Sequence, residues 1–398
     1  MKKPGIIAAV TAVAAVALIL AVSSCKKRDT GKSGLHEGQV VYIGTYGSSF
    51  YRYIFDYPSG TFTPLGEAAL ANPSYIALGE ENAKDGIYDL YAASEAGSDS
   101  GVYSYADDIM LTRTGGNRET GKDPCFLFFD RASNTVMTAD YGGGSVSVFR
   151  VNDNGSVGER IQTLAFQGSG PVASRQEASH IHHLKFLPGH DGSGTRYLLA
   201  SDLGADRIRV MKMEPLSGGP GAGEDHVLTY LPELDIMCGE GSGPRNMEVD
   251  TLRNRVYCLT ELSGELLVFD FSFDGDGMPV FSLADRLLAD DLHAGGSADV
   301  HLHPSGRFLY TSHRLKKDGI SIFSVGQDGA VVKTGYCRTG RHPRSFAITP
   351  DGNVMLVACR DDYAVEAYEI DPRTGMLSYS GMKLKLDGDM PSCIRIAE

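Results

Sequence analysis

Residues 297–325 read SADVHLHPSGRFLYTSHRLKKDGISIFSV, and they hold three short runs in which apolar and polar side chains alternate. A period of two over runs this short is typical of β-strands. The turn Pro-Ser-Gly at 304–306 reverses the chain between the first two runs. The stretch therefore predicts consecutive antiparallel strands.

The first of these runs recurs along the whole chain, about every 45 to 60 residues. The related runs lie at 72–78, 123–129, 181–188, 243–250, 297–304, 342–350 and 390–396. After most of them come a turn, a second apolar strand, a third strand and a ragged fourth. Four antiparallel strands at this period indicate a blade of a β-propeller. A β-sandwich or two stacked sheets would not explain seven equivalent runs.

The two ends of the repeat complete each other. Three strands are predicted within residues 39–69 without an inner partner, and the run at 390–396 is one strand with nothing after it. Pairing the chain termini would close the ring and remove open sheet edges. We therefore expect an all-β, seven-bladed β-propeller with four-stranded antiparallel blades over residues 39–398.

The N-terminal residues form a separate unit. Lys2 and Lys3 precede an apolar run over 6–22, and Ser23 and Ser24 lead to Cys25. This pattern indicates an export signal, and VSSC resembles the bacterial lipobox. We expect a lipoprotein signal peptide over 1–24, a lipid on Cys25 and a flexible tether over 25–38.

This prediction places the protein outside the cytoplasm, on the periplasmic face or the cell surface, attached to a membrane by the N-terminal lipid. An uncleaved transmembrane anchor is the alternative, although roughly 17 apolar residues lie at the short end for spanning a bilayer.

Charge and cysteine content exclude several classes of partner. Loss of residues 1–24 removes two lysines and no acid, which takes the net charge from −13 to −15. Such a surface should repel nucleic acid, and an anionic substrate would need a local cluster of arginines. The six cysteines beyond Cys25 form no C-x-x-C pair, so we expect buried thiols and no metal or redox site. No pattern in the chain signals an oligomeric state.

The propeller geometry predicts where polar side chains meet. The first strand of each blade lines the central channel, so equivalent residues should form a ring. Alignment of the seven runs gives that ring as Ser74, Cys125, His182, Arg245, Ala298, Arg344 and Ser392.

The second strand of each blade should end at the same mouth of the channel, because the first two strands form an antiparallel hairpin. This places Glu261 beside Arg245, and Asp202 beside His182. His313 and Arg314 are expected beside Asp299. A carboxylate, an imidazole and several guanidiniums should therefore meet at one mouth.

These groups suit the opening of an acyl bond by water. Glu261 or His182 could act as the base, while arginines hold an anionic group and stabilise the oxyanion. The chain has no G-x-S-x-G motif, which favours direct attack by water over an acyl-enzyme. His180 and His183 flank His182, but neighbouring strand residues point to opposite sides, which argues against a metal site. A purely structural ion pair between Arg245 and Glu261 is the alternative.

The motifs SHIHHLKFLP, GSGPRNMEVD, LTELSGELLVF and ADVHLHPSGRFLYTSHR are similar to blade signatures of the seven-bladed lactonase family. That family is typified by cycloisomerase-type 6-phosphogluconolactonase and is related to fungal carboxymuconate lactonizing enzyme. The similarity covers about residues 40–397 and implies hydrolysis of a sugar-acid lactone without a cofactor or required metal. Matched by motif, the implied catalytic residues are His182, Arg245, Glu261 and Arg314. Around them we expect Arg344, Asp202, His180, Asp299 and His301 to contact the substrate.

Three functions follow as hypotheses. The first is hydrolysis of 6-phosphogluconolactone or of an unphosphorylated aldonolactone, so the expected partner is a small anionic or sugar-derived lactone. The second is a non-catalytic surface propeller that binds glycan or protein, because fold does not determine function. The third is a muconate-type lactonizing isomerase acting on an unsaturated dicarboxylate.

Overall fold

Seven antiparallel sheets form the part of the chain that the structure describes, which covers residues 38–81, 88–189, 192, 194–213 and 228–397 of a computed structural model. The helical elements there are four 3-10 turns: η1 (Gly97–Asp99), η2 (Leu203–Ala205), η3 (Pro232–Leu234) and η4 (Arg360–Asp362). Within these ranges no helix is long and apolar enough to cross a membrane. The predicted signal peptide, Cys25 and nearly all of the predicted tether lie outside the described residues.

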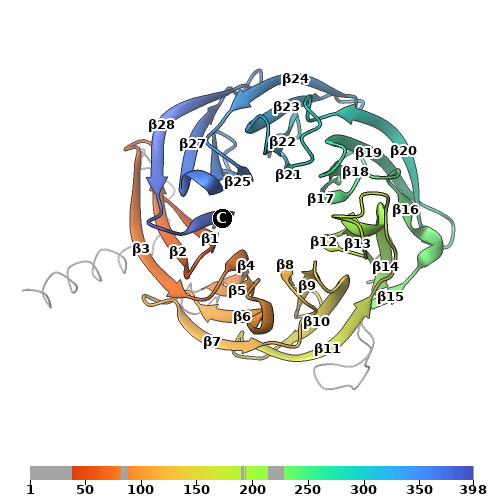
Figure 1. The fold of residues 1–398 in the computed structure, drawn as a ribbon, viewed down its shortest axis with the longest axis horizontal. Coiled ribbons are helices and arrows are strands. Elements are labelled where there is room, and N and C mark those ends of the chain that lie inside the picture. The colour runs from red at the N-terminus through yellow and green to blue at the C-terminus, as the bar shows by residue number, and fades with distance from the viewer. Residues whose placement is uncertain (1–37, 82–87, 190–191, 193, 214–227, 398) are drawn as a thin grey trace, which may run out of the picture. The chain divides into compact units, whose positions relative to one another are not determined.

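Each blade runs from an inner strand near the axis to an outer strand at the rim (Figure 1). Blade 1 contains β29 (Met390–Ile396), β1 (Gln39–Tyr46), β2 (Ser49–Asp56) and β3 (Thr61–Ala69). Blade 2 contains β4 (Pro73–Glu81), β5 (Tyr88–Ser94), β6 (Gly101–Ala106) and β7 (Thr112–Asn117). Blade 3 contains β8 (Pro124–Asp130), β9 (Thr135–Asp140), β10 (Ser145–Val151) and β11 (Val157–Ala165).

The other four blades follow the same order. Blade 4 contains β12 (Ile181–Phe186), β13 (Arg196–Asp202), β14 (Arg207–Met213) and β15 (Leu228–Tyr230), and β16 (Ile236–Met237) also pairs with β14. Blade 5 contains β17 (Pro244–Asp250), β18 (Arg255–Thr260), β19 (Glu265–Phe273) and β20 (Pro279–Leu288). Blade 6 contains β21 (Ser297–Leu302), β22 (Phe308–His313), β23 (Gly319–Val325) and β24 (Val331–Arg338). Blade 7 contains β25 (Pro343–Ile348), β26 (Val354–Cys359), β27 (Ala364–Ile370) and β28 (Leu377–Lys385).

The ring closes through the two ends of the propeller, as predicted. Strand β29 pairs antiparallel with β1, with Ile394 opposite Ile43. Inner strands of neighbouring blades contact each other all the way round, in the order β29, β4, β8, β12, β17, β21, β25 and back to β29 (Figure 1). The prediction of a seven-bladed β-propeller with four-stranded antiparallel blades is confirmed.

Apolar side chains pack between neighbouring blades and hold the ring together. Between blades 5 and 6, for example, Tyr257 and Val268 pack with Val300, Leu309 and Phe323, and all five are buried. Burial of one such side chain contributes roughly 1.5–3 kcal/mol relative to exposure. Seven such clusters, one at each interface, spread the core around the ring, and the one between blades 7 and 1 joins the two ends of the propeller.

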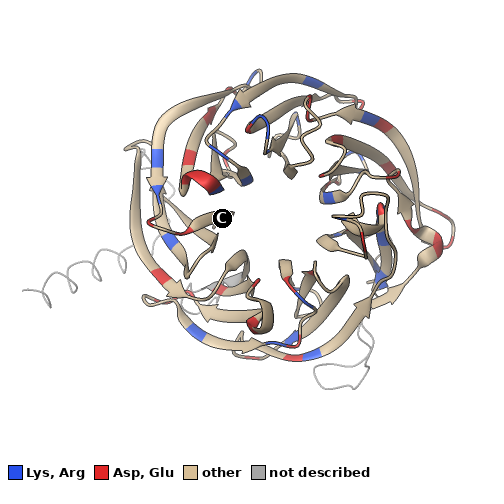
Figure 2. Ribbon diagram, in the orientation of Figure 1, with Lys and Arg blue, Asp and Glu red and all other residues tan. Residues whose placement is uncertain are grey.

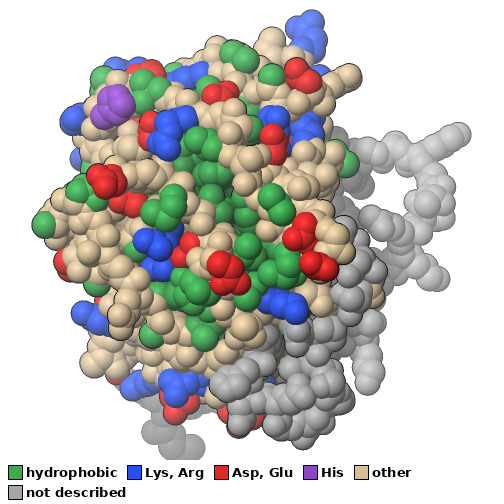
Figure 3. All heavy atoms as spheres, turned by 90° about the vertical axis from the view of Figure 1, so that its right-hand side faces the viewer, with side chains coloured by type: hydrophobic (Ala, Val, Ile, Leu, Met, Phe, Trp, Pro, Cys, Tyr) green, Lys and Arg blue, Asp and Glu red, His purple; other side chains and the backbone are tan. Residues whose placement is uncertain are grey.

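The outer strands face solvent on one side. On β20 the side chains of Val280 and Leu283 are about half exposed, at 50% and 51%. Figure 3 shows this side of the molecule, where apolar side chains lie among basic and acidic ones. The six cysteines of the propeller are free, and five of them are buried, which agrees with the expected buried thiols.

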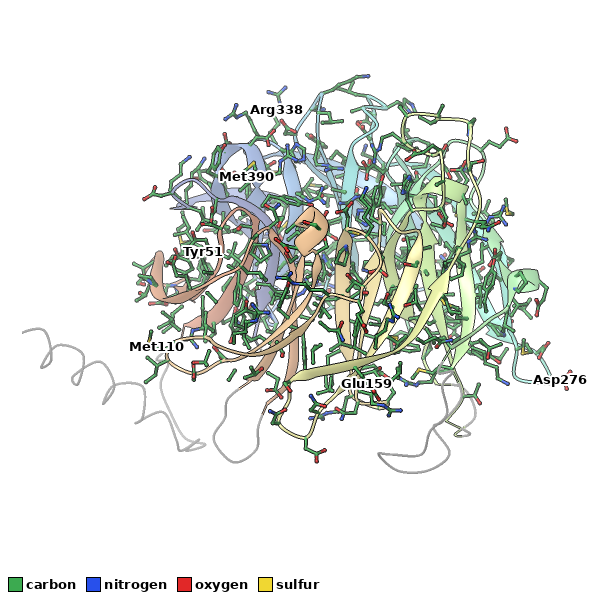
Figure 4. All side chains as sticks on the ribbon, turned by 60° about the horizontal axis from the view of Figure 1, so that its bottom comes forward. Tyr51, Met110, Glu159, Asp276, Arg338 and Met390 are labelled. Atoms are coloured by element: carbon green, nitrogen blue, oxygen red, sulfur yellow. The ribbon has the colours of Figure 1, made fainter. Side chains whose placement is uncertain are left out.

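The two faces of the disc carry different chain segments. Inner strands begin, and second strands end, at the face that Met390 and Arg338 mark in Figure 4. Met110, Glu159 and Asp276 lie toward the other face in that view. The start of every inner strand and the end of every second strand therefore lie at one mouth of the central channel.

Candidate functional site

A β-bulge occurs near the start of every inner strand. The residues left unpaired there include Asp299 on β21 and all seven of the predicted ring: Ser74, Cys125, His182, Arg245, Ala298, Arg344 and Ser392. A bulge re-aims a side chain away from the regular alternation. Six of the seven ring residues, all except Ala298, line one cavity of about 320 Å³, counting its space open to solvent. Tyr75, Phe126, Asn246, Asp299 and Ser345 complete its wall.

Basic residues gather on several of these inner strands. Figure 2 shows Lys and Arg positions on β12, β17 and β25 near the propeller axis. Arg245 lies on β17 and Arg344 on β25, and both line the cavity. The local charge at this mouth is thus opposite to the net charge of the chain, which is −13.

One carboxylate contacts three of the guanidiniums. Glu261 follows the last residue of β18, and its Oε2 lies 2.8 Å from Nε of Arg245 on the adjacent β17. Its Oε1 lies 2.9 Å from Nη2 of Arg175 and 3.4 Å from Nη2 of Arg314. The antiparallel hairpin of blade 5 accounts for the first pair, as predicted. The side chain of Glu261 is only 8% exposed, so its ion pairs with the buried Arg245 and Arg314 are shielded from water, whereas Arg175 is partly exposed.

These contacts determine the protonation of Glu261. Burial alone would raise its pKa, but Arg314, Arg245 and Arg175 outweigh burial and lower the pKa to about 2. A carboxylate so stabilised is a weak proton acceptor. Glu261 is therefore suited to hold the arginines in place, since both of its carboxylate oxygens are engaged by them.

His182 differs from Glu261 in its contacts, because no ion pair among the residues that the structure describes engages its ring. It lines the cavity, it is 7% exposed, and its Nδ1 has no hydrogen-bond partner within the described residues. Burial, reinforced by the positive charges of Arg245 and Arg344, lowers the pKa of His182 well below its ordinary value. The imidazole is therefore neutral at pH 7, with a ring nitrogen available to a ligand.

Arg344 occupies another part of the cavity wall, in blade 7. Its Nη2 donates a hydrogen bond of 2.5 Å to Oη of Tyr46, and its guanidinium lies 4.9 Å from the centre of the Tyr46 ring. Oη of Tyr46 donates to Oε1 of Glu95 at 2.9 Å. Burial alone would lower the pKa of Arg344, but Tyr46 and Glu95 raise it above its ordinary value, so this residue stays cationic.

Arg314 stands at the same mouth but not beside Asp299. Its Nε donates to the backbone oxygen of Gly296 at 2.8 Å, and Nη1 lies 3.1 Å from Nε2 of His342. The neighbouring His313 is buried away from the cavity, with Ser297 and Thr311 at its two ring nitrogens. The predicted grouping of His313 and Arg314 with Asp299 is therefore corrected, because the bulge in β21 turns Asp299 toward the axis.

Asp299 lines the cavity, and His301 lies two residues further along β21. Oδ1 of Asp299 accepts a hydrogen bond of 2.7 Å from Asn246. Nε2 of His301 lies 3.3 Å from Oδ2 of Asp299, and its Nδ1 lies 3.5 Å from Oε2 of Glu248. His301 itself is absent from the cavity wall, so the structure places it behind Asp299.

Asp202 and His180 are also placed behind the cavity wall. Asp202 has no exposed surface, and its carboxylate accepts hydrogen bonds from Ser179, the backbone N–H of His180 and Arg209. The expected pairing of Asp202 with His182 is corrected, because the bulge at His182 leaves the backbone of His180 in that place. The ring of His180 stacks on Tyr141 at 4.4 Å, and its Nδ1 bonds the Tyr141 backbone oxygen at 2.8 Å.

Several residues of the mouth were not predicted. Arg175 comes from the loop before β12, and its Nη2 also donates to Oη of Tyr141 at 3.3 Å. Tyr46, Glu95 and Tyr141 each lie at or directly after the end of the second strand of a blade, close to the position that Glu261 and Arg314 hold in their own blades. The same alignment could have found these three. No repeat signal marks Arg175. Among the described residues no group of three or more His, Cys, Asp or Glu side chains could hold a metal ion.

Comparison with known proteins identifies relatives over nearly the whole propeller. The 6-phosphogluconolactonase of Bacillus subtilis is 27% identical over 347 residues, which cover 85% of this chain and 93% of that protein. The 6-phosphogluconolactonase of Formosa agariphila is 30% identical over 271 residues, which cover 67% of this chain and 72% of that protein.

Solved structures show the same fold. A Bacteroides fragilis protein assigned to the 6-phosphogluconolactonases is 33% identical, with a TM-score of 0.82 over 92% of this chain and 100% of that chain. The periplasmic gluconolactonase of Pseudomonas aeruginosa is 25% identical, with a TM-score of 0.76 over 90% of this chain and 99% of that chain. The family described as "Lactonase, 7-bladed beta-propeller" matches residues 40–396. The seven-bladed ring and its polar cavity agree with this match. This chain therefore belongs to the lactonase family of seven-bladed β-propellers.

Proposed function

We propose that the protein hydrolyses a sugar-acid lactone in this cavity. The observation that carries the proposal is the neutral imidazole of His182, whose Nδ1 has no partner among the described residues, in the same cavity wall as Arg245 and Arg344. A neutral base next to fixed cations suits a reaction in which negative charge develops on an acyl oxygen. The relatives named lactonases support the same class of reaction.

His182 acts as the base in this proposal. It takes one proton from water, and the water oxygen forms a bond to the carbonyl carbon of the lactone. Arg245 in the cavity wall stabilises the oxyanion that develops, and Arg314 adds positive charge from behind the wall, because both guanidiniums are held in place by Glu261. The bond between the carbonyl carbon and the ring oxygen then breaks. The product is a hydroxy carboxylate, and one proton is released to solvent.

The cations also indicate the charge of the substrate. Arg175, Arg245 and Arg314 share the single carboxylate of Glu261, so they leave an excess of positive charge at the mouth. We infer an anionic substrate, such as 6-phosphogluconolactone, and Arg344 is the arginine we assign to its phosphate or carboxylate. Of the other predicted contacts, Asp299 borders the substrate, whereas Asp202, His180 and His301 support the residues that do.

Proton release from lactones tests this function. Wild type should acidify a weakly buffered solution of 6-phosphogluconolactone faster than one of glucono-δ-lactone. His182→Gln should lower kcat by about 10²- to 10⁴-fold, because it removes the base. His293→Asn is the matched control, since His293 bonds the Ser263 backbone oxygen away from the cavity wall. Binding of these lactones without turnover by wild type would contradict the proposal.

We also propose that a lipid on Cys25 attaches the propeller to a membrane after export. The apolar run before Cys25 and its VSSC motif support this location. Radioactive palmitate should label wild type in cells, and Cys25→Ser should remove the label and release the protein from the membrane fraction. Equal labelling of the variant would contradict lipid attachment at Cys25.

A further inference from the structure

A second set of polar groups lies across the ring from His182, with Arg344 in the cavity wall and Tyr46 and Glu95 behind it. Blade 7 supplies Arg344, blade 1 supplies Tyr46 and blade 2 supplies Glu95. Oη of Tyr46 accepts from Arg344 at 2.5 Å and donates to Glu95 at 2.9 Å. One phenol thus connects a cation of the cavity wall to a carboxyl group.

Glu95 and Glu261 occupy equivalent positions in their blades, each directly after the second strand. Their surroundings differ. Glu261 contacts three guanidiniums, whereas Oε1 of Glu95 meets the Tyr46 phenol. Burial raises the pKa of Glu95, and Arg344, the nearby Ser74 hydroxyl and Tyr46 offset that rise only in part. Two carboxyl groups whose pKa values are moved apart can take separate roles in one reaction.

Ser74 lies in the cavity wall next to this set. The hydroxyl of this buried residue lies close enough to Glu95 to lower the pKa of that carboxyl group. Around the ring, Ser74 in blade 2 and Arg344 in blade 7 flank blade 1, away from His182 in blade 4. A bound ligand would thus have His182 on one side and the Tyr46 set on the other.

We propose that Tyr46 and Glu95 form the proton-donating arm of the site, which protonates the ring oxygen as the lactone opens. The proposal rests on the lactone hydrolysis proposed above. When the C–O bond breaks, its electron pair remains on the ring oxygen, and the phenol O–H turns from Glu95 to give this oxygen its proton. Burial raises the pKa of Tyr46, and Arg344 offsets part of this cost of forming the phenolate.

The protons balance over one turnover. The phenolate of Tyr46 recovers a proton from Glu95, which is half-buried and exchanges with solvent. His182, which took a proton from water, returns it to solvent. Lactone and water thus give a hydroxy carboxylate and one proton, with Tyr46, Glu95 and His182 restored.

Tyr46→Phe tests the donor because it removes one oxygen and keeps the ring beside Arg344. We expect kcat to fall about 100-fold or more on the lactone that wild type hydrolyses fastest. Two constants should stay within about threefold of wild type: KM, and the Kd for gluconate or 6-phosphogluconate measured by calorimetry. The reason is that the donor acts only when the bond breaks.

A second variant tests the carboxyl group behind the phenol. Glu95→Gln should lower kcat by about tenfold or more. Tyr57→Phe is the matched control, since Oη of Tyr57 donates to Glu369 at 2.6 Å in another tyrosine–glutamate pair away from the cavity wall.

Two outcomes overturn the proposal while leaving lactone hydrolysis intact. One is a kcat of Tyr46→Phe within about threefold of wild type. The other is a loss of product affinity in Tyr46→Phe as large as that in Arg344→Gln, which would make Tyr46 a positioning residue for the arginine. A wild-type protein that opens no lactone would overturn both this inference and the function on which it rests.

Discussion

Glu261 illustrates how one buried side chain organises a reactive centre. Three guanidiniums converge on it, and the two buried ones, Arg245 and Arg314, would be costly to bury without a negative partner. The carboxylate thus fixes Arg245 and Arg314 in the orientation that an oxyanion requires. In our proposal Glu261 contributes to catalysis indirectly, because it holds the arginines whose positive charge stabilises the oxyanion.

Glu261→Gln should destabilise the folded protein at pH 7. Removing one partner of a buried ionic group leaves the other charges uncompensated, so the free energy of unfolding should fall by about 3–5 kcal/mol. Denaturant titration measures the change. Glu369→Gln is the control, because Glu369 is exposed and such substitutions usually change stability by about 0.5 kcal/mol or less.

The same effect should depend on pH. The pKa of Glu261 is lowered to about 2 in the folded state, below its ordinary value. Its stabilisation is therefore complete above about pH 4.5 and is lost as the pH falls toward 2. The difference between wild type and Glu261→Gln should shrink over that range. A difference that stays constant from about pH 7 to about pH 2.5 would contradict the assigned ion pairs.

Inner strands of different blades are joined by a second row of charges, further along the channel. Nζ of Lys185 on β12 lies 2.8 Å from Oε1 of Glu248 on β17. Glu248 and Asp299 both contact His301 on β21. Burial alone would lower the pKa of His301, but Asp299 and Glu248 raise it to about 10. Charges of alternating sign thus connect blades 4, 5 and 6.

His301→Asn tests this connection between strands. The folded pKa of His301 lies above its ordinary value, so its stabilisation is complete below about pH 6.5 and is lost as the pH rises through about 10. Wild type should be more stable than the variant by about 2 kcal/mol at pH 6, after allowance for partial exposure, and the gap should close toward about pH 10.5. Thermal unfolding at several pH values measures it, with His293→Asn as the control. A gap that widens with pH would contradict a protonated His301.

The closed ring depends on one strand from the far end of the chain. Strand β29 supplies the inner position of blade 1, where Oγ of Ser392 donates to the Ser74 backbone oxygen at 2.8 Å. Nε of Arg395 donates to the Ile76 backbone oxygen at 3.1 Å, also in blade 2. Without β29, blade 1 would expose the inner edge of β1, and the ring would lack one wall of its channel.

Truncation after Asp389 should therefore remove the cooperative unfolding of the propeller. We expect a lower Tm with a broader transition, and association in gel filtration caused by the open edge of β1. Deletion of residue 398 alone is the control and should leave the Tm unchanged. A truncated chain that melts like wild type would show that the termini are not needed for closure.

Sequence repetition was sufficient to predict the fold and much of the cavity. The period-two alternation places every second strand residue on one face, so aligning seven runs also aligned the residues of the ring. The contact between Arg245 and Glu261 followed from the same regularity, since both belong to one hairpin. Tyr46, Glu95 and Tyr141 lie at equivalent positions at the ends of second strands. The type of side chain at this position differs between blades, so no repeated motif identifies these residues in the sequence.

What the sequence determined by itself was the set of blades, their closure and the ring of residues at the starts of the inner strands, because these follow from local strand geometry. The tertiary structure alone showed that Arg175 reaches Glu261, that Arg344 contacts a tyrosine 298 residues away, and that His182 is neutral. Contacts across the ring depend on distances between blades that do not follow each other in the chain. Protonation depends on burial and on the summed field of those blades, and neither quantity is encoded in the spacing of residues along one strand.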